Sequence, residues 1–425
     1  MMSGVHEGGE RPCLTASQPA AAPATQPGAE RRLRIAVLNR VFSPIGGGAE
    51  RYSIALVEQL ASRHEIHVYA QQIDHHWPGV TYHIVSAPLT RPRWINQLWY
   101  ATATWWATRR GFDVVHSHEN TWHGQVQTLH VLPVKYNLFH GRTGFRHILR
   151  WIKVLTSPRL IVYLLFERAR LSGDTRRRCV VVTSVSLLQV VGSTYPKLVH
   201  MLKVVTPGVG LFDPTDSAQK KLARNSLGLP QSGSCILFVG HDYRKKGLDV
   251  LIKAMSELPA DSFLAVVGSP TQISVFRDLA NMAGLGSRVF FLGALKDVSP
   301  AYAAADILAH PTLEDTFAMV VLEAMAHGLP VVVSDERHCG ISALLKNGVN
   351  ALILDDPKDT KKLSRALNQV LQDSMLRQRL SYAAVAFARL HQWPAIARLQ
   401  EEIYYSVGGV AAGFVATGSS CNPSS

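Results

Sequence analysis

Short apolar runs alternate with helical patterns along most of the chain. The run RIAVLN (34–39) precedes a glycine turn and then RYSIALVEQLASR (51–63), whose apolar residues recur at helical spacing. The strand-like runs EIHVYA, YHIVSAP and DVVHSH follow. Strands that alternate with helices predict a parallel sheet covered by helices on both faces.

The same alternation starts again in the second half of the chain. Its predicted strands are CVVVTSVS, LKVVTPGVG, SCILFVGH, SFLAVVGSP, RVFFLGAL, DILAHPT and ALILDDP, and its predicted helices include GLDVLIKAMSEL, a pair within LSRALNQVLQDSMLRQRLSYAAVAFA, and HQWPAIARLQEEIYYSV. We therefore expect an α/β protein with two Rossmann-like halves that face each other across a cleft, divided near residues 205–215. In open sheets of this kind, ligands bind at the carboxyl ends of the strands.

This pattern predicts five segments. They are a disordered tail (1–30), a first domain (31–205), a second domain (206–385), a C-terminal helix that packs back on the first domain (386–408) and a second tail (409–425). The first tail is rich in Ala, Pro, Gly and Ser and has no apolar core of a signal peptide.

Five scattered cysteines without a C-x-x-C pair argue against a zinc site and a disulfide framework, and favour a reducing compartment. We therefore expect a cytoplasmic protein.

Positive charge is concentrated in one half of the chain. Residues 31–178 hold 21 Lys and Arg against 8 Asp and Glu, whereas residues 179–425 hold 22 against 20. A basic half predicts an anionic partner or surface. A nucleic-acid partner is disfavoured, because this half has no known nucleic-acid motif and its charge explains none of the motifs in the second half.

Two basic stretches rich in Trp and Leu, 91–110 and 148–171, are candidates for contact with a membrane. Neither satisfies the rule for a transmembrane helix, because 148–171 carries Arg150, Lys153, Pro158 and Arg159. One interpretation is a helix that lies on an anionic membrane, peripheral to the inner face of the plasma membrane. The other is an amphipathic helix packed on the sheet with its charges in water.

Two turns could bind phosphate. The glycines Gly46, Gly47 and Gly48 stand between a strand and a helix, where main-chain N–H groups can approach an anion, although a tight turn alone would also need them. In GHDYRKKGLDVLIKA, the side chains of Arg244, Lys245 and Lys246 precede a helix and could clamp a diphosphate. A solvated charge run is the alternative for the second turn.

The stretch EDTFAMVVLEAMAHGLPVVVSD (314–335) poses a question, because Glu323 interrupts an apolar helix. A buried carboxylate is costly without a partner, so either a protein donor or a ligand should satisfy it. Asp315 or Thr316 lies where a helix N-cap would be. The amides of Phe317, Ala318 and Met319 would then be free first-turn donors for an anion.

This stretch resembles the E-x7-E motif of the retaining glycosyltransferases of family 4, which have the GT-B fold. The family pattern E-x-F-G-x-x-x-x-E-A-x-A-x-G-x-P-V-V stands here as D-T-F-A-M-V-V-L-E-A-M-A-H-G-L-P-V-V. The GGGAE turn, the FVG…KKG unit, the VTPGV turn and RVFFLGAL follow the family's order, over roughly residues 34–405. The form H-D-Y-R-K-K-G is similar to the branch of lipopolysaccharide-core glucosyltransferases.

The resemblance implies roles for individual residues. Glu323 would hold the ribose of the donor, and Asp315, or its neighbour Glu314, would contact the donor sugar. Lys246 would bind the diphosphate with Arg244 or Lys245 as its basic partner. The donor would also meet the amides of Phe317, Ala318 and Met319 and the loop of Gly46, Gly47 and Gly48.

The sequence departs from the family at two points. Its first motif acid is Asp315 rather than Glu, and the family's G-V-D is Gly208-Val209-Gly210 here.

The family also places a histidine at a strand end near the reacting sugar. Here His118 and His130 are the candidates, with a slight preference for His130, and a histidine bonded within a loop is the alternative for either.

The resemblance implies transfer of a sugar from a nucleotide diphosphate sugar to a glycan or lipid-linked acceptor, with retained anomeric configuration, in the synthesis of lipopolysaccharide or another surface polysaccharide. The basic residues and the helix N-terminus would stabilise the leaving diphosphate, and no metal or other cofactor is expected. Two alternatives remain: a nucleotide-sugar epimerase or hydrolase of the same fold, and a non-catalytic subunit of a polysaccharide assembly.

Overall fold

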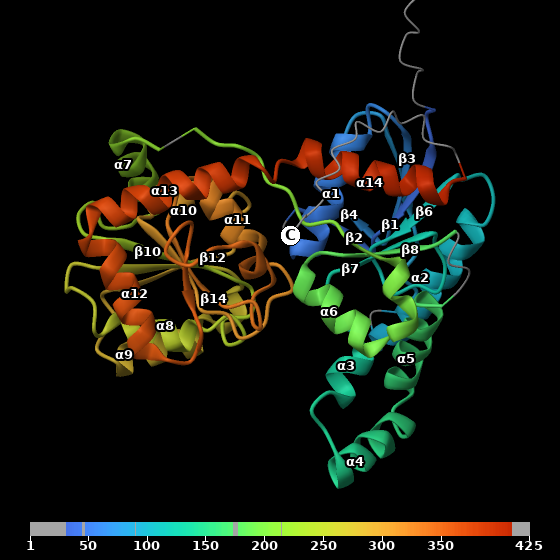
Figure 1. Ribbon diagram of the computed structural model, residues 1–425, viewed down its shortest axis with the longest axis horizontal. Helices are drawn as coiled ribbons and strands as arrows, with labels where there is room; N and C mark the ends of the chain where they lie inside the picture. Colours follow the sequence, from blue (N-terminus) through green and yellow to red (C-terminus); the bar gives the residue numbers. More distant parts are fainter. Residues whose placement is uncertain (1–30, 45–46, 90, 173–176, 214, 410–425) are drawn as a thin grey trace, which may run out of the picture. The chain divides into compact units, whose positions relative to one another are not determined.

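The computed structural model describes residues 31–44, 47–89, 91–172, 177–213 and 215–409. The two predicted tails, 1–30 and 409–425, lie outside these ranges except for residue 409, and so does Gly46. The described residues from Arg32 onward form one compact unit built around two parallel sheets (Figure 1).

The first sheet has the strand order β5-β3-β1-β6-β7-β8-β9, and every neighbouring pair is parallel. Its strands are β1 (Arg34–Leu38), β3 (Glu65–Ala70), β5 (Val80–Ile84), β6 (Val114–Ser117), β7 (Val126–Leu129), β8 (Cys179–Val182) and β9 (Leu202–Val204). A short parallel pair, β2 (Val41–Phe42) and β4 (Gln72–Ile73), lies apart from it. The predicted strand EIHVYA coincides with β3.

The second sheet has the order β12-β11-β10-β13-β14-β15 and is also fully parallel. Its strands are β10 (Cys235–Val239), β11 (Phe263–Val267), β12 (Val289–Gly293), β13 (Ile307–His310), β14 (Val331–Ser334) and β15 (Leu352–Leu354). The central strands are apolar and buried throughout, because helices cover both faces of a parallel sheet. The prediction of two doubly wound α/β halves is confirmed.

Helices connect these strands in both halves. The first half has α1 (Gly48–Leu60), α2 (Arg93–Thr108), α3 (Val134–Phe139), α4 (Gly144–Leu155), α5 (Pro158–Arg170), α6 (Val185–Thr194) and a 3-10 helix, η1 (Pro196–Met201). The second half has α7 (Ser217–Ser226), α8 (Leu248–Met255), η2 (Pro270–Gln272), α9 (Ile273–Met282), α10 (Ser299–Ala304), α11 (Met319–Ala326), η3 (Gly340–Leu344), α12 (Thr360–Gln372) and α13 (Ser374–Arg389).

The last helix, α14 (Trp393–Val407), contacts α1 of the first half (Figure 1). Its apolar residues Ile396, Ile403 and Tyr404 share a core cluster with strands β1 and β3. After the second half, the described chain therefore returns to the first.

One predicted strand was too long. The run CVVVTSVS forms β8 only as far as Val182, and α6 begins at Val185. Ser184 caps this helix, since its hydroxyl accepts a hydrogen bond from the N–H of Leu187 at 3.1 Å.

The two stretches rich in Trp and Leu have different surroundings. Helix α2 buries one face, which includes Tyr100 and Thr104, against the sheet. The stretch 148–171 is two helices, since Pro158 occupies the first turn of α5 and begins a new helix. Of these, α4 packs mainly against its neighbours α3 and α5, and it lies farther from the sheet than they do (Figure 1).

Helix α4 buries only Val154 and leaves most of its apolar side chains in water. Its exposed apolar residues are Phe145, Ile148, Leu149, Trp151, Ile152 and Leu155. None of the helices among the described residues is both long and apolar enough to cross a membrane.

Candidate functional site

The loop between β13 and α11 holds Asp315 in a network of donors. Its Oδ1 accepts the N–H groups of Ala318 at 2.9 Å and Phe317 at 3.3 Å. Its Oδ2 lies 2.5 Å from Nζ of Lys246 and 3.2 Å from Nε2 of His310. Burial alone raises the pKa of this carboxyl, but the His310 hydrogen bond and the Lys246 charge outweigh burial and hold the pKa well below its usual range.

The structure places the three residues of the predicted basic turn at two separate sites. Lys246 and Lys245 both reach the loop before α11, where Lys245 Nζ lies 2.7 Å from the Glu314 carboxylate. Gly247, with a φ of 78°, ends this turn, and a Cβ there would lie 2.1 Å from the main-chain oxygen of Pro311. Arg244 instead lines a separate hollow beside α8 and α9. Of the two candidate partners for Lys246, the structure therefore brings only Lys245 to the same cavity.

Helix α11 starts later than the sequence predicted. Ala318 is its N-cap residue, with a φ of 71°, and it is the only non-glycine residue with positive φ among the residues that the structure describes. The prediction of Asp315 or Thr316 as N-cap was wrong, because Asp315 is held in a bridge to Cys339 by the hydrogen bond from its N–H to the oxygen of His338.

This arrangement also changes the predicted amide donors. The N–H groups of Phe317 and Ala318 donate to Asp315 rather than standing free.

Glu323 has two protein donors in this structure. The Tyr302 hydroxyl donates to its Oε2 at 2.7 Å, and Nη1 of Arg51 lies 2.9 Å from its Oε1. The carboxylate is 16% exposed, so it opens on a cavity while it stays paired. The sequence left open whether a protein donor or a ligand satisfies Glu323, and the structure shows protein donors.

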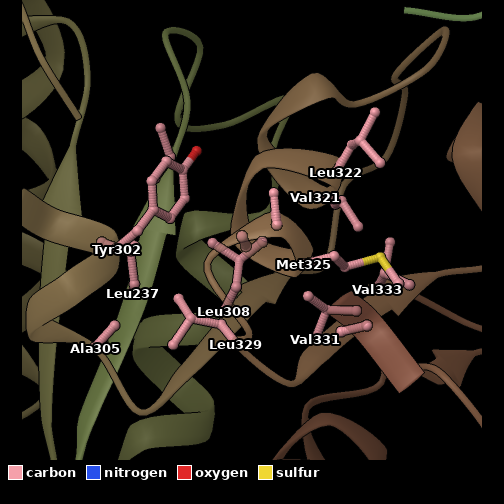
Figure 2. Packing of buried hydrophobic residues seen from close by; sticks show 14 of the residues in the cluster. Leu237, Tyr302, Ala305, Leu308, Val321, Leu322, Met325, Leu329, Val331 and Val333 are labelled. Carbon is pink, nitrogen blue, oxygen red and sulfur yellow. The ribbon is translucent and has the colours of Figure 1, made fainter. Parts of the chain in front are cut away.

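Tyr302 belongs to the core behind α11. Figure 2 shows its ring at one side of the apolar cluster that includes Leu237, Leu308 and Met325. Packing of this ring fixes the hydroxyl that holds Glu323, and burial raises the pKa of that hydroxyl.

Two cavities meet at Met319, which lines both. One, of about 300 Å³, is lined by Arg51, Tyr302 and Glu323, and by the Phe212 and His327 rings, which stack at 3.8 Å between centroids. The other, of about 410 Å³, contains most of the remaining predicted residues: Gly47, Gly48, His130, Lys245, Lys246, Glu314, Asp315, Phe317 and Ala318.

The two candidate histidines form one buried pair. His118 follows β6 and His130 follows β7, and His118 Nδ1 lies 2.9 Å from His130 Nε2. Burial, with a smaller effect of Arg170, lowers the pKa of His130 to about 3, so both rings are neutral near pH 7. Only His130 lines the larger cavity, and the main-chain oxygen of His130 accepts the hydroxyl of Thr316 at 2.7 Å.

Sequence reasoning missed several members of this site. Arg51, Tyr302 and His310 belong to no motif recognised in the sequence. Arg51 and Tyr302 contact Glu323 from distant positions in the sequence, whereas His310 lies only five residues before Asp315.

Models of two glycosyltransferase families match the chain. Residues 46–189 match Glycosyltransferase Family 4, and residues 219–386 match Glycosyl transferases group 1. The first half of the chain thus matches a family 4 glycosyltransferase domain and the second half a group 1 glycosyltransferase domain, and the fold is GT-B. Asp315, Glu323 and Lys246 all lie within the second matched segment, whereas Arg51 and the histidine pair lie within the first.

Individual relatives agree with this assignment. The D-inositol 3-phosphate glycosyltransferase of Xylanimonas cellulosilytica is 31% identical over 214 residues, which are 48% of this chain and 51% of that protein. The matched region thus spans about half the length of the curated relatives.

Two solved structures share the fold. The crystal structure of WaaG, a glycosyltransferase involved in lipopolysaccharide biosynthesis, has a TM-score of 0.74 at 21% identity and covers 87% of this chain and 99% of its own. Anabaena Alr3699/HepE in complex with UDP-glucose has a TM-score of 0.68 at 19% identity and covers 88% of this chain and 100% of its own.

Proposed function

We propose that this protein transfers a sugar from a nucleotide diphosphate sugar to an acceptor hydroxyl and retains the anomeric configuration. One observation carries the proposal: the two cavities that share Met319 place the Glu323 carboxylate in one and the Lys246–Asp315 pair in the other. Along a nucleotide diphosphate sugar, the ribose hydroxyls need a hydrogen-bond acceptor, the diphosphate needs a cation, and the sugar hydroxyls need a second hydrogen-bond acceptor.

Each residue has a part in this proposal. Glu323 accepts hydrogen bonds from the ribose hydroxyls. These hydroxyls bind beside Arg51 and Tyr302 or displace them from the carboxylate. Lys246 and Lys245 offset the charge that develops on the leaving diphosphate, which is electrostatic stabilisation of the transition state. Asp315, kept ionised by Lys246 and His310, accepts hydrogen bonds from the sugar once Lys246 turns from its carboxylate to the diphosphate.

The proposal assigns the charge on the diphosphate to lysines, so we expect transfer to continue in the presence of EDTA. It also assigns no covalent role to Asp315, whose carboxylate is occupied by four donors. Retention would then follow a front-face route, in which the acceptor attacks from the side that the diphosphate leaves. Analysis of the anomer formed from an α-linked donor tests retention itself.

The identity of donor and acceptor is proposed from the relatives. A structural neighbour binds UDP-glucose, and another acts in lipopolysaccharide biosynthesis. We propose a uridine diphosphate hexose as the donor and a glycan or lipid-linked acceptor of the cell surface.

The exposed apolar face of helix α4 favours an acceptor that lies at a membrane. Phe145, Ile148, Leu149 and Ile152 recur at the spacing of one helix face, and all four are exposed. The chain has no acidic residue between Glu119 and Glu167, so the cations around this face have no local counter-charge. We propose that α4 lies on the anionic inner face of the plasma membrane.

A donor screen tests the enzymatic proposal. Binding and slow hydrolysis of uridine, guanosine and adenosine diphosphate sugars are compared for the wild type, Glu323→Ala and Lys246→Ala, with Lys253→Ala and Glu402→Ala as exposed controls. We expect one class of nucleotide sugar to bind to the wild type and to the two controls. Only Glu323→Ala and Lys246→Ala should lose this binding. Equal binding by all variants would remove both residues from the donor site.

The same screen separates the two alternatives. An epimerase or a dedicated hydrolase would convert the donor at full rate without an acceptor. A non-catalytic subunit would bind the donor and leave it unchanged with every acceptor.

A further inference from the structure

A second group of basic side chains lies at the opposite edge of the first sheet from the histidine pair. Strands β6, β7 and β8 are parallel, and His118 and His130 follow the carboxyl ends of the first two. Gln125 and Arg178 stand just before the amino ends of β7 and β8. Four residues of β7 at about 3.3 Å each separate the two edges by about 13 Å. This second group is therefore distinct from the donor cavities.

These side chains line a cavity of about 310 Å³. Arg109 enters it from the end of α2, His123 from the loop before β7, and Arg177 and Arg178 from the segment before β8. Among the residues that the structure describes, no acidic side chain lines the cavity. Its three arginines thus converge from two separate elements on one space, and His123 reaches it from a third.

The positive charge of these arginines is not neutralised by carboxylates within the described part of the chain. Arg178 donates to the main-chain oxygens of Ala169, Ser172 and Trp122, which are neutral. Arg109 lies over the Trp106 ring, with Cζ 3.7 Å from the ring centroid. Arg109 follows the C-terminal end of α2, where the helix dipole favours a positive charge. This interaction is weak and leaves most of the charge of Arg109 exposed.

His123 supplies an independent sign of a ligand. Its side chain is only 8% exposed, yet neither Nδ1 nor Nε2 has a hydrogen-bond partner in the described structure. Burial, with the charge of Arg178 as a smaller effect, lowers the pKa of His123 to about 4, so the ring is neutral and keeps one N–H donor. Buried polar atoms without partners are rare in folded proteins, and both ring nitrogens lie beneath the surface of the cavity, so we expect the ring to turn toward a bound group that accepts its N–H.

We propose that this cavity binds a phosphate group, held by Arg109, Arg177 and Arg178 and by the N–H of His123. A phosphate offers acceptor oxygens in several directions, and guanidinium groups match its geometry better than ammonium groups do. This inference does not depend on the proposed transfer reaction. The phosphate could belong to a soluble metabolite or to the headgroup of an anionic phospholipid. Trp105 and Trp106, both exposed beside the cavity, suit the headgroup level of a membrane.

The first arm of the test uses inorganic phosphate on the full chain with ¹⁵N-labelled histidine, at constant ionic strength maintained with chloride. We expect the ring resonances of His123 to shift and to saturate. The variant Arg109→Gln/Arg177→Gln changes two exposed residues and should weaken binding by about tenfold or more. The control Arg110→Gln/Arg365→Gln removes the same charge and should bind as the wild type does. No saturable shift, or equal binding by both variants, would overturn the proposal.

The second arm distinguishes the two sources of phosphate. Flotation with phosphatidylcholine vesicles, with and without phosphatidic acid, is measured in the background Ile148→Asn/Ile152→Asn, which removes the apolar face of α4. Binding that requires both phosphatidic acid and the Arg109/Arg177 pair would identify a lipid headgroup. Saturable binding of inorganic phosphate without vesicle binding would identify a soluble ligand.

Discussion

Nζ of Lys246 lies 2.5 Å from Oδ2 of Asp315, although the two residues are 69 positions apart in sequence. This ion pair joins the turn before α8 to the loop before α11. The cation proposed for the diphosphate and the acid proposed for the sugar are therefore already oriented by each other before a donor binds. The pair, and His310 behind it, also makes the stability of the protein depend on pH.

Asp315→Asn should destabilise the protein at neutral pH and progressively less in acid. The folded state lowers the pKa of Asp315, so its contribution is complete above the unfolded value of about 3.9 and is lost as the pH falls below it. Urea unfolding from pH 6 down to about pH 3 should show the difference from the wild type shrinking. A constant difference, or the same trend in the exposed control Asp261→Asn, would contradict this assignment.

Replacing His130 should make the protein less sensitive to mild acid. The folded state keeps this ring neutral, whereas the unfolded chain protonates it below about pH 6.5, so stability is lost as the pH falls through that value. At pH 5 the cost is roughly 2 kcal/mol for one such histidine. We expect His130→Gln to show a smaller fall in the free energy of unfolding between pH 7.5 and 5, measured by urea denaturation. The exposed control His241→Gln should fall as the wild type does.

Ala318→Gly should raise stability, although Gly usually lowers it in a helix. The φ of 71° at Ala318 costs an L-residue about 1 kcal/mol or more, and the family pattern has Gly at this position. Because Gly also makes the unfolded chain more flexible, we expect a net gain of about 0.5 to 1 kcal/mol. Calorimetry should show a higher Tm, with Ala366→Gly in α12 as a control that lowers it. A lower Tm for Ala318→Gly would mean that the loop tolerates this conformation without strain.

Arg51→Ala should destabilise the protein, because Glu323 then keeps only the Tyr302 hydroxyl. Removing one partner from a mostly buried charge costs about 1 to 3 kcal/mol. The control Arg337→Ala breaks an exposed pair with Asp335 and should change stability little. Midpoints of chemical denaturation compare the two. Equal effects would show that the Arg51–Glu323 pair is no stronger than a surface pair.

Ile148→Asn/Ile152→Asn should reduce binding to anionic vesicles by about tenfold or more, since these two side chains lie on the exposed apolar face of α4. The control Leu222→Asn/Leu390→Asn changes two equally exposed apolar residues elsewhere. Flotation should also decrease at high salt, because screening weakens the attraction of the basic residues. Retention of both variants at every salt concentration would exclude α4 as the membrane contact.

The sequence by itself determined the two parallel sheets. Short apolar runs and period-3.6 hydrophobic patterns act over a few residues, so strands such as β3 and β10 and the helix pair α12 and α13 could be predicted directly. The sequence also singled out Glu323, because a carboxylate in an apolar helix is an anomaly visible in the chain itself, whereas Asp315 and Lys246 became candidates through the resemblance to the family.

Only the tertiary structure decided which partners these residues have. Arg51 and Tyr302 reach Glu323 from other elements, so no local spacing could reveal them. His310 lies only five residues before Asp315, but the contact depends on how the loop after β13 folds back. The same holds for Ala318, whose left-handed conformation follows from the bridge between Asp315 and Cys339. Hydrogen bonds and ion pairs between distant segments depend on how those segments pack, and that information is not carried by any short window of sequence.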